Sequence, residues 1–268
     1  MRSTIIYGPT YAVGGRELPL YNGEHSDQGF IKEILDMGLK IFSDYQIAHN
    51  KVLFFTVTLK YPVMFNFETL DNVAIVQFCH EMYRQLTAQG FDPAYFWVRE
   101  RDTSYHNHFH LAIWLNGSVT QHPQRSIEII KNVWDKCVRI TGCVHFANAY
   151  DHFIMLRRQV DAAKDNGENW RQFLTAYKTF SYFAKVYSKE ADLISNCRHY
   201  GYSQPKKVDH YMIFEDWKVP EKYRKKFNQN HRLSRWYAPR LQGDGTGSPT
   251  RALNYSPLAT IALLLQMQ

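Results

Sequence analysis

The sequence predicts an α+β fold, with a mostly antiparallel central sheet and helices packed on one face of it. Two observations lead to this prediction. Several short segments alternate apolar and polar residues with a period near two, as strands do, and the segments between them repeat apolar residues at helical spacing. After an opening helix, the segments follow one another as β-α-β-β-α-β-β-α, an order of hairpins and crossover helices that is typical of this class.

The first elements follow from local signals. Residues 1–27 are punctuated by glycine, proline and asparagine, which predicts an irregular N-terminal arm. Apolar groups at helical spacing predict a helix over 28–48. The segment 52–59, rich in valine, leucine, phenylalanine and threonine, is a predicted strand. A further helix is expected over 71–89, with Asp71 as its N-terminal cap.

The rest of the domain is predicted to contain four strands and two helices. In chain order these are the strands 95–100 and 106–115, the helix 124–140, the strands 143–149 and 153–156, and the helix 170–190. The polar run 102–104 has the composition of a turn, so the first two strands are expected to form a hairpin. Gly142 is expected to end the helix before it.

Charge is concentrated near the C-terminus. The 268 residues carry a net charge of +7 and the pI is about 9.1, which favours a polyanionic partner but is also common in proteins that never bind nucleic acid. Residues 206–240 contain ten Lys and Arg against four Asp and Glu, interleaved with aromatic residues. This composition suits single-stranded nucleic acid, and a solvated basic tail fits it equally. We therefore divide the chain into the arm, a domain over 28–205 and a basic, aromatic extension over 206–268.

The cysteines and the apolar runs bear on location. The four cysteines show no CxxC spacing, which fits reduced thiols in a cytoplasmic protein better than a disulfide framework or a zinc knuckle. The N-terminus lacks the pattern of a signal peptide. Because no apolar run approaches the roughly 20 residues needed to cross a bilayer, no membrane association is expected.

The hairpin over 95–116 carries the first candidate site. His108 and His110 share a face, because successive side chains of a strand point to opposite faces. If the chain folds back about Ser104, Glu100 lies opposite His108 and faces the same way. Two imidazoles and a carboxylate can bind one divalent metal, including zinc or non-haem iron. Two ordinary histidines on a polar face would give the same pattern.

The last predicted helix carries the second candidate site. Tyr182 and Lys185 are three residues apart and are therefore neighbours on one helix face. A nearby ammonium and a metal-polarised phosphate would both help a tyrosine hydroxyl to attack. Tyr187 lies about 140° further round the helix and is a poor second nucleophile. Core aromatics and a solvated lysine would explain the same residues.

Taken in order, these motifs resemble those of the HUH endonucleases, the rolling-circle replication initiators and relaxases. The likeness is strongest to the filamentous-phage (inovirus) gene-II-type replication initiators and to related prophage proteins. The segments that carry it are 49–53 (HNKVL), 95–100 (YFWVRE), 108–112 (HFHLA) with 115–117 (LNG), 155–158 (MLRR), and 181–185 (SYFAK) with Lys189. Together they span roughly residues 30–205.

The resemblance implies a site and a reaction. His108 and His110 look like metal ligands, and Glu100 matches the place of the acidic third ligand. The implied ion is Mg²⁺ or Mn²⁺. Tyr182 looks like the nucleophile, with Lys185 as its helper, and would join to a 5′-phosphate of single-stranded DNA at a replication origin, releasing a 3′-OH that primes replication. The same resemblance suggests a host helicase as a partner and the cytoplasm of a bacterial host as the location.

Other residues are assigned more broadly. Arg157, Lys189, Arg224 and Lys225 are expected to contact DNA. His106 also falls on the metal face, where the simplest family pattern has no histidine. A fourth ligand, a phosphate contact and no role at all each fit this position, and we favour a residue that is not a ligand. A single well-placed tyrosine suggests single-tyrosine chemistry and leaves open how a second strand transfer is done.

Three other functions fit the same residues. The first is a relaxase or transposase of the same chemistry, which the motifs do not separate from a replication initiator. The second is a non-catalytic module that binds single-stranded nucleic acid. The third is a metal-dependent hydrolase that uses Glu100, His108 and His110 without Tyr182. Metal-dependent covalent trapping of DNA would distinguish the tyrosine enzymes from the other two.

Overall fold

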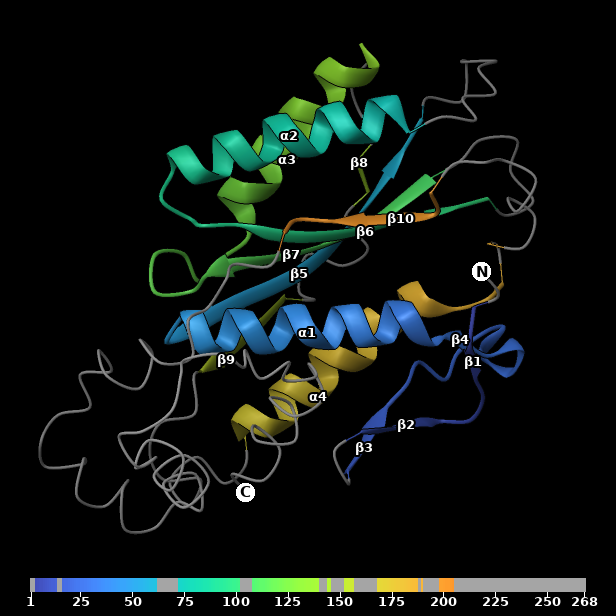
Figure 1. Cartoon of the computed structure of the whole chain (residues 1–268). Coiled ribbons are helices and arrows are strands. Elements are labelled where there is room, and N and C mark those ends of the chain that lie inside the picture. Colours follow the sequence, from blue (N-terminus) through green and yellow to red (C-terminus); the bar gives the residue numbers. More distant parts are fainter. Residues whose placement is uncertain are drawn as a thin grey trace, which may run out of the picture.

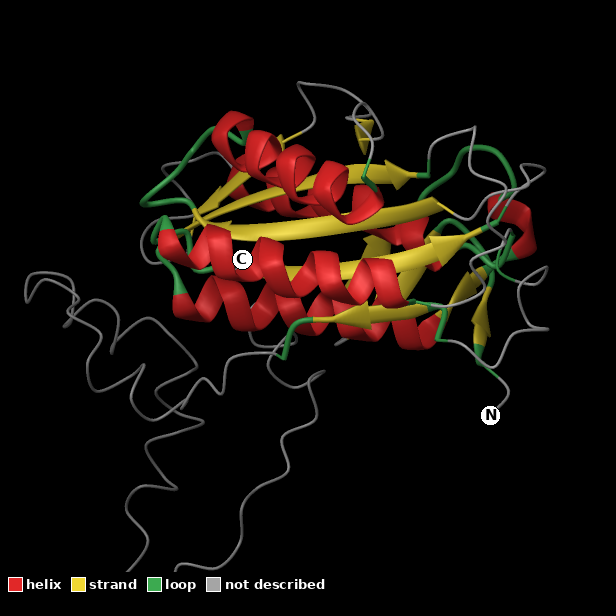
Figure 2. Cartoon of the chain, turned by 90° about the horizontal axis from the view of Figure 1, so that it is seen from above, coloured by secondary structure: helices red, strands yellow, loops and turns green. Residues whose placement is uncertain are grey.

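The computed structural model describes residues 3–13, 16–61, 72–101, 108–139, 144–145, 152–156, 168–187, 189 and 198–204. In these residues the chain forms one central antiparallel sheet between two layers of helices (Figure 1). Seen from above, the long helices run in the general direction of the strands (Figure 2). The α+β class and the predicted order of elements after the opening helix are both confirmed.

The elements have the following bounds. The helices are α1 (Lys32–Ala48), α2 (Val73–Ala88), α3 (Gln124–Val138) and α4 (Glu168–Ser181), which is followed by a 3₁₀ turn, η2 (Tyr182–Ala184). The central strands are β5 (Lys51–Lys60), β6 (Ala94–Glu100), β7 (His108–Asn116), β8 (Val144–His145), β9 (His152–Leu156) and β10 (Tyr200–Tyr202). The N-terminal segment contains β1 (Ile5–Ile6), β2 (Thr10–Val13), β3 (Arg16–Pro19), the short 3₁₀ helix η1 (Ser26–Gln28) and β4 (Phe30–Ile31).

The central hairpin has the register that the sequence predicts. β6 and β7 are antiparallel, and Glu100 lies directly opposite His108. β7 pairs on its other edge with β5, whose far edge pairs with both β8 and β9. β10, which the sequence analysis does not predict, pairs with the outer edge of β6. The two strands of the candidate metal hairpin are therefore held on both sides by neighbouring strands.

Helices cover both faces of the sheet (Figure 1). α1 and α4 pack with Phe54 and Trp114 on one face, and α2 and α3 pack with Phe55 and Ile113 on the other. The prediction that helices cover one face only is therefore wrong. The reason lies in β5, where residues 52–55 are all apolar and fully buried, so both faces of the strand need cover.

The N-terminal arm is not irregular. β2 and β3 form an antiparallel hairpin, and β1 pairs with β4 immediately before α1. Tyr11, Leu18 and Leu20 are buried in the same hydrophobic cluster as the inner faces of α1 and α4. The first 27 residues thus contribute to the core of the domain, which the glycine- and proline-rich composition did not suggest.

The ends of α2 and α3 differ from the prediction in detail. Asn72 takes the cap position of α2 without a side-chain cap hydrogen bond, and Asp71 lies outside the described residues. α3 ends at Val138 because Arg139 adopts the left-handed conformation, with φ of 58°. Gly142, the expected stop, lies outside the described residues.

The last helix, α4, is shorter than predicted. It ends at Ser181 and continues as the 3₁₀ turn η2. Lys185 is then extended and forms an isolated bridge with Phe30, and the Val186 N–H donates to the carbonyl of Gly29 at 3.0 Å. The chain leaves the helix here because these backbone groups find partners in the N-terminal segment, which helical spacing cannot reveal.

The close approach of α1 and α4 generates the first testable prediction. A Cβ built on Gly38 of α1 would overlap the ring of Phe180 in α4. We expect Gly38→Ala to lower the free energy of unfolding by about 2 kcal/mol through overpacking, although alanine is the better helix former by about 1 kcal/mol. Urea unfolding measures the change. In a Phe180→Leu background the cost should shrink, and an equal cost in both backgrounds would contradict the contact.

Candidate metal centre

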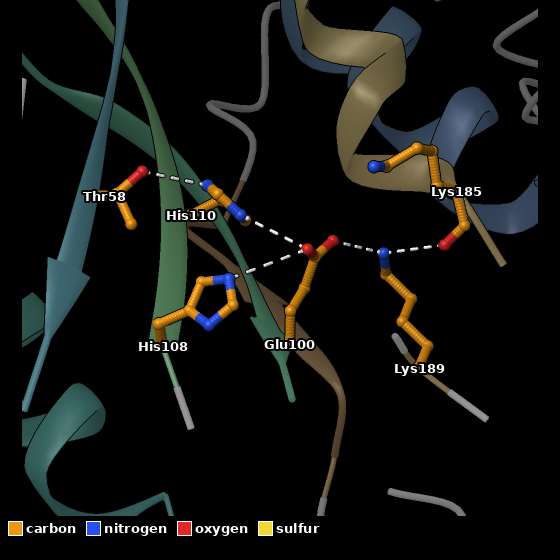
Figure 3. A network of polar contacts seen from close by, with 6 residues as sticks. All are labelled: Thr58, Glu100, His108, His110, Lys185 and Lys189. Atoms are coloured by element: carbon orange, nitrogen blue, oxygen red, sulfur yellow. Dashed lines mark hydrogen bonds and ion pairs between the residues drawn. The ribbon is translucent and has the colours of Figure 1, made fainter. Parts of the chain in front are cut away.

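The β6–β7 hairpin brings two histidines and a glutamate together. One ligand atom from each of Glu100, His108 and His110 lies within 4.8 Å of the others. Glu100 Oε2 is 3.2 Å from Nε2 of His110 and 3.9 Å from Nε2 of His108 (Figure 3). The three residues that the sequence analysis assigned as metal ligands therefore form one cluster.

The alternation of β7 explains how the strand presents this cluster. Phe109 is fully buried in the layer of α2 and α3, so its neighbours His108 and His110 face the opposite side of the sheet. That side is the one covered by α1 and α4. Glu100 ends β6 on the same side, and its side chain is only 3% exposed. A buried carboxylate needs a charged or hydrogen-bonding partner, and the cluster supplies several.

Thr58 orients one of the imidazoles from the next strand. It lies opposite His110 in the β5–β7 pair, and its Oγ1 is 3.0 Å from His110 Nδ1. His110 Nε2 is buried and has no hydrogen-bond partner among the described residues, although it lies beside Glu100 Oε2. If Nδ1 carries the proton and donates it to Thr58, the lone pair of Nε2 faces the carboxylate, which is the arrangement of a metal-ligating histidine.

Lys189 supplies the positive charge that faces Glu100. Its Nζ donates to Glu100 Oε1 at 2.7 Å and to the carbonyl oxygen of Lys185 at 2.8 Å (Figure 3). Burial raises the pKa of Glu100, but the positive charge of Lys189 opposes burial and helps to hold that pKa well below its ordinary value. Burial lowers the pKa of Lys189, and Glu100 offsets only part of this effect. The carboxylate is therefore ionised and available as an anionic ligand.

The donor set fits a divalent cation. Nitrogen and oxygen ligands lie about 2.0–2.2 Å from zinc, so ligands of one ion are roughly 3.0–3.6 Å apart. The 3.2 Å distance from Glu100 Oε2 to His110 Nε2 lies within this range. The 3.9 Å distance from Glu100 Oε2 to His108 Nε2 would enter the range after a small side-chain shift. Imidazole nitrogens suit Zn²⁺ and Fe²⁺ best, and Mg²⁺ and Mn²⁺ are bound mainly by oxygen ligands. A site with two imidazoles and one carboxylate is therefore a better match for a transition metal than for Mg²⁺.

Tyr182 and Lys185 lie beside this cluster. The Tyr182 ring meets the His110 ring edge-on, with 5.1 Å between the ring centroids. The Lys185 Nζ lies 3.9 Å from the centroid of the Tyr182 ring, and Lys185 is buried. The structure thus brings the two sequence motifs together. Tyr187 stacks on His25 at 3.7 Å, which agrees with the expectation that it points elsewhere.

The structure adds a residue from the N-terminal segment that the sequence analysis missed. The Tyr21 ring lies edge-on to the Tyr182 ring, with 5.1 Å between centroids, and 5.4 Å from the Lys185 Nζ. Its backbone N–H donates to Ser181 Oγ at 2.7 Å. Nothing in the spacing of the sequence links Tyr21 to the end of α4. Thr58, by contrast, could have been found, since it lies in a predicted strand on the polar side of its alternation.

The expected DNA contacts are only partly covered by the structure. Lys189 lies inside the domain and directs its ammonium to Glu100, so it offers no exposed charge to DNA. Three other expected contacts, Arg157, Arg224 and Lys225, lie outside the described residues, as do His106 and the basic extension. Their assignments stay predictions.

Comparison with known proteins identifies a protein family. The model of the YagK/YfjJ C-terminal domain matches residues 18–203, a span that includes the candidate metal cluster, Tyr182 and Lys189. No curated protein matches the chain, and no solved structure does. In the part of the chain that the structure describes, no helix is both long enough and apolar enough to cross a membrane.

The contact between Thr58 and His110 leads to a prediction for cation binding. Thr58→Val removes the partner of His110 Nδ1 while keeping the shape of the side chain. We expect the affinity for Mn²⁺, measured by isothermal titration calorimetry, to fall about tenfold because the ring is no longer held. Thr56→Val is the matched control, because Thr56 faces the same way on β5 but lies opposite Ala112. Equal losses in the two variants would show that the hydrogen bond has no specific role.

Proposed function

The chain belongs to the YagK/YfjJ C-terminal domain family, and we propose that it is a rolling-circle replication initiator that nicks and rejoins single-stranded DNA at a specific site. One observation carries this proposal. Tyr182 lies against His110, so a tyrosine from the end of α4 meets a metal-type cluster built about 80 residues earlier in the chain. A tyrosine and a His-His-Glu cluster at one place suit phosphoryl transfer through a covalent intermediate.

The cluster would hold the cation of the reaction. Glu100, His108 and His110 would bind it, and the resemblance to HUH endonucleases gives Mg²⁺ or Mn²⁺ as the ion. When bound, the cation would act as a Lewis acid on the scissile phosphate. Lys189 holds Oε1 of Glu100, and Thr58 holds the His110 ring, so both ligands are oriented before a substrate arrives.

Tyr182 would act as the nucleophile. Its hydroxyl oxygen attacks the phosphorus of the scissile phosphodiester, and the bond from phosphorus to the 3′ oxygen breaks. The hydroxyl proton leaves the tyrosine, and the departing 3′ oxygen gains a proton to become the 3′-OH that primes replication. The 5′-phosphate stays on Tyr182 until attack by a 3′-OH reverses the step and rejoins the strand.

Lys185 would support this attack from the face of the ring. Its ammonium lies 3.9 Å from the Tyr182 ring centroid and is largely removed from water, so its charge is weakly screened. A positive charge at this place stabilises the phenolate form, which is the better nucleophile. The role proposed for Lys185 is therefore electrostatic, acting across the ring face.

The wider context of the reaction follows from the resemblance. A replication origin in single-stranded DNA is the proposed substrate, a host helicase a proposed partner and the bacterial cytoplasm the proposed location. The positive extension over 206–268 would add DNA contacts. A relaxase or transposase would use the same groups, whereas a hydrolase or a simple binding module would not require Tyr182 as a nucleophile.

Covalent trapping tests the proposed chemistry. Protein mixed with Mn²⁺ and a pool of single-stranded oligonucleotides should give a DNA-linked band on a denaturing gel. We expect Tyr182→Phe to abolish the band because it removes the attacking oxygen, and His108→Ala to reduce it at least about a hundredfold because one proposed ligand is lost. Omission of Mn²⁺ should have the same effect as His108→Ala.

Tyr187→Phe is the matched control for this assay. Tyr187 lies five residues after Tyr182 in the chain, and its ring stacks on His25. Its band should equal that of the unmodified protein. An adduct that persists in Tyr182→Phe would leave the chemistry standing and show that another residue is the nucleophile. DNA binding without any adduct would favour the binding module, and metal-dependent hydrolysis in Tyr182→Phe would favour the hydrolase.

A further inference from the structure

The carboxylate of Glu100 is shared between two different partners. Its Oε2 faces the two histidines, and its Oε1 accepts a hydrogen bond from the Lys189 ammonium at 2.7 Å. Both side chains of the ion pair are almost fully buried, at 3% and 4% exposure. A second hydrogen bond, from Lys189 to the carbonyl of Lys185, fixes the ammonium in place. Oε2 of Glu100 is therefore the carboxylate oxygen that a cation beside the two histidines would bind.

The ion pair also determines the net charge of the site. Among the residues that the structure describes, Glu100 is the only anionic group of the cluster, and Lys189 balances it with an opposite charge. With neutral histidines, the ligand set and Lys189 together carry no net charge. A divalent cation bound there would therefore keep its full double charge, in surroundings where charges interact more strongly than in water. Many metal sites instead use anionic ligands to neutralise the ion.

We propose that Lys189 tunes this centre for an anionic ligand: it weakens the binding of the cation alone and strengthens the binding of a phosphate group to the cation-loaded site. This rests on the proposed function, in which that group is the scissile phosphodiester. Both effects have one cause. The Lys189 ammonium repels the incoming cation and attracts the incoming phosphate. It acts by its charge and by its hydrogen bond to Glu100, and it bonds to neither the cation nor the phosphate.

The tuning role predicts opposite changes for two binding events. Lys189→Met keeps most of the apolar stem and removes the charge. By calorimetry, the dissociation constant for Mn²⁺ should fall about tenfold in Lys189→Met, because the repulsion is lost. The gain in Mn²⁺ affinity that inorganic phosphate produces should shrink by a similar factor. A role that is merely structural would weaken both events together.

Two further variants keep this experiment decisive. Lys189→Arg retains the charge and should stay close to the unmodified protein in both measurements. Lys131→Met removes the same charge from the exposed side of α3, on the other face of the sheet, and should change neither. Lys189→Met leaves a buried carboxylate without its counter-charge, so its metal-free melting temperature should fall and Mn²⁺ should raise it by more than in the unmodified protein.

The possible results separate the two proposals. If the unmodified protein binds no Mn²⁺, the metal-dependent function fails and the role of Lys189 fails with it. If the unmodified protein binds Mn²⁺ but Lys189→Met binds it equally or more weakly, only the tuning role is overturned. Should Lys189→Met not fold, the charge-retaining Lys189→Arg decides: a loss of phosphate enhancement in this folded variant would contradict a role based on charge.

Discussion

The candidate site depends above all on the register between β6 and β7. Because side chains alternate along a strand, a slip of one residue would turn His108 and His110 toward α2 and α3 and bring Phe109 into the site. Such a slip is costly, since Phe109 and Leu111 are fully buried in the opposite layer. The hydrophobic core on one side of the sheet thereby fixes the candidate metal ligands on the other.

A second constraint joins the two ends of the domain. The segment after α4 is held by the N-terminal segment, through the bridge between Phe30 and Lys185 and the hydrogen bond from Val186 to Gly29. Gly29 has a φ of 88°, and a Cβ there would overlap the side chain of Ile5. Only glycine suits this position. The place of Tyr182 is therefore set jointly by α4 and by a segment roughly 150 residues earlier.

These two constraints explain what the sequence could and could not reveal. The pairing of Glu100 with His108 is local, so alternation and a short turn were enough to predict it. The cover on both faces of the sheet was readable in principle from the unbroken apolar run 52–55. The contacts of Tyr21 and Lys189 are not local: they depend on where α4 ends, and that end is set by backbone partners far away in the chain. Periodicity carries no information about such partners.

The end of α4 also divides one face of the sheet into a core and a site. Along β7, Trp114 and Ala112 lie in the hydrophobic layer of α1 and α4, and His110 and His108 continue the same row beyond it. The change from apolar to polar coincides with the point where α4 gives way to η2. A longer helix could not place Lys185 in the bridge with Phe30, and the carbonyl that receives Lys189 would be turned into the helix. The early end of the helix therefore places both Tyr182 and the Lys189 counter-charge beside the candidate metal cluster.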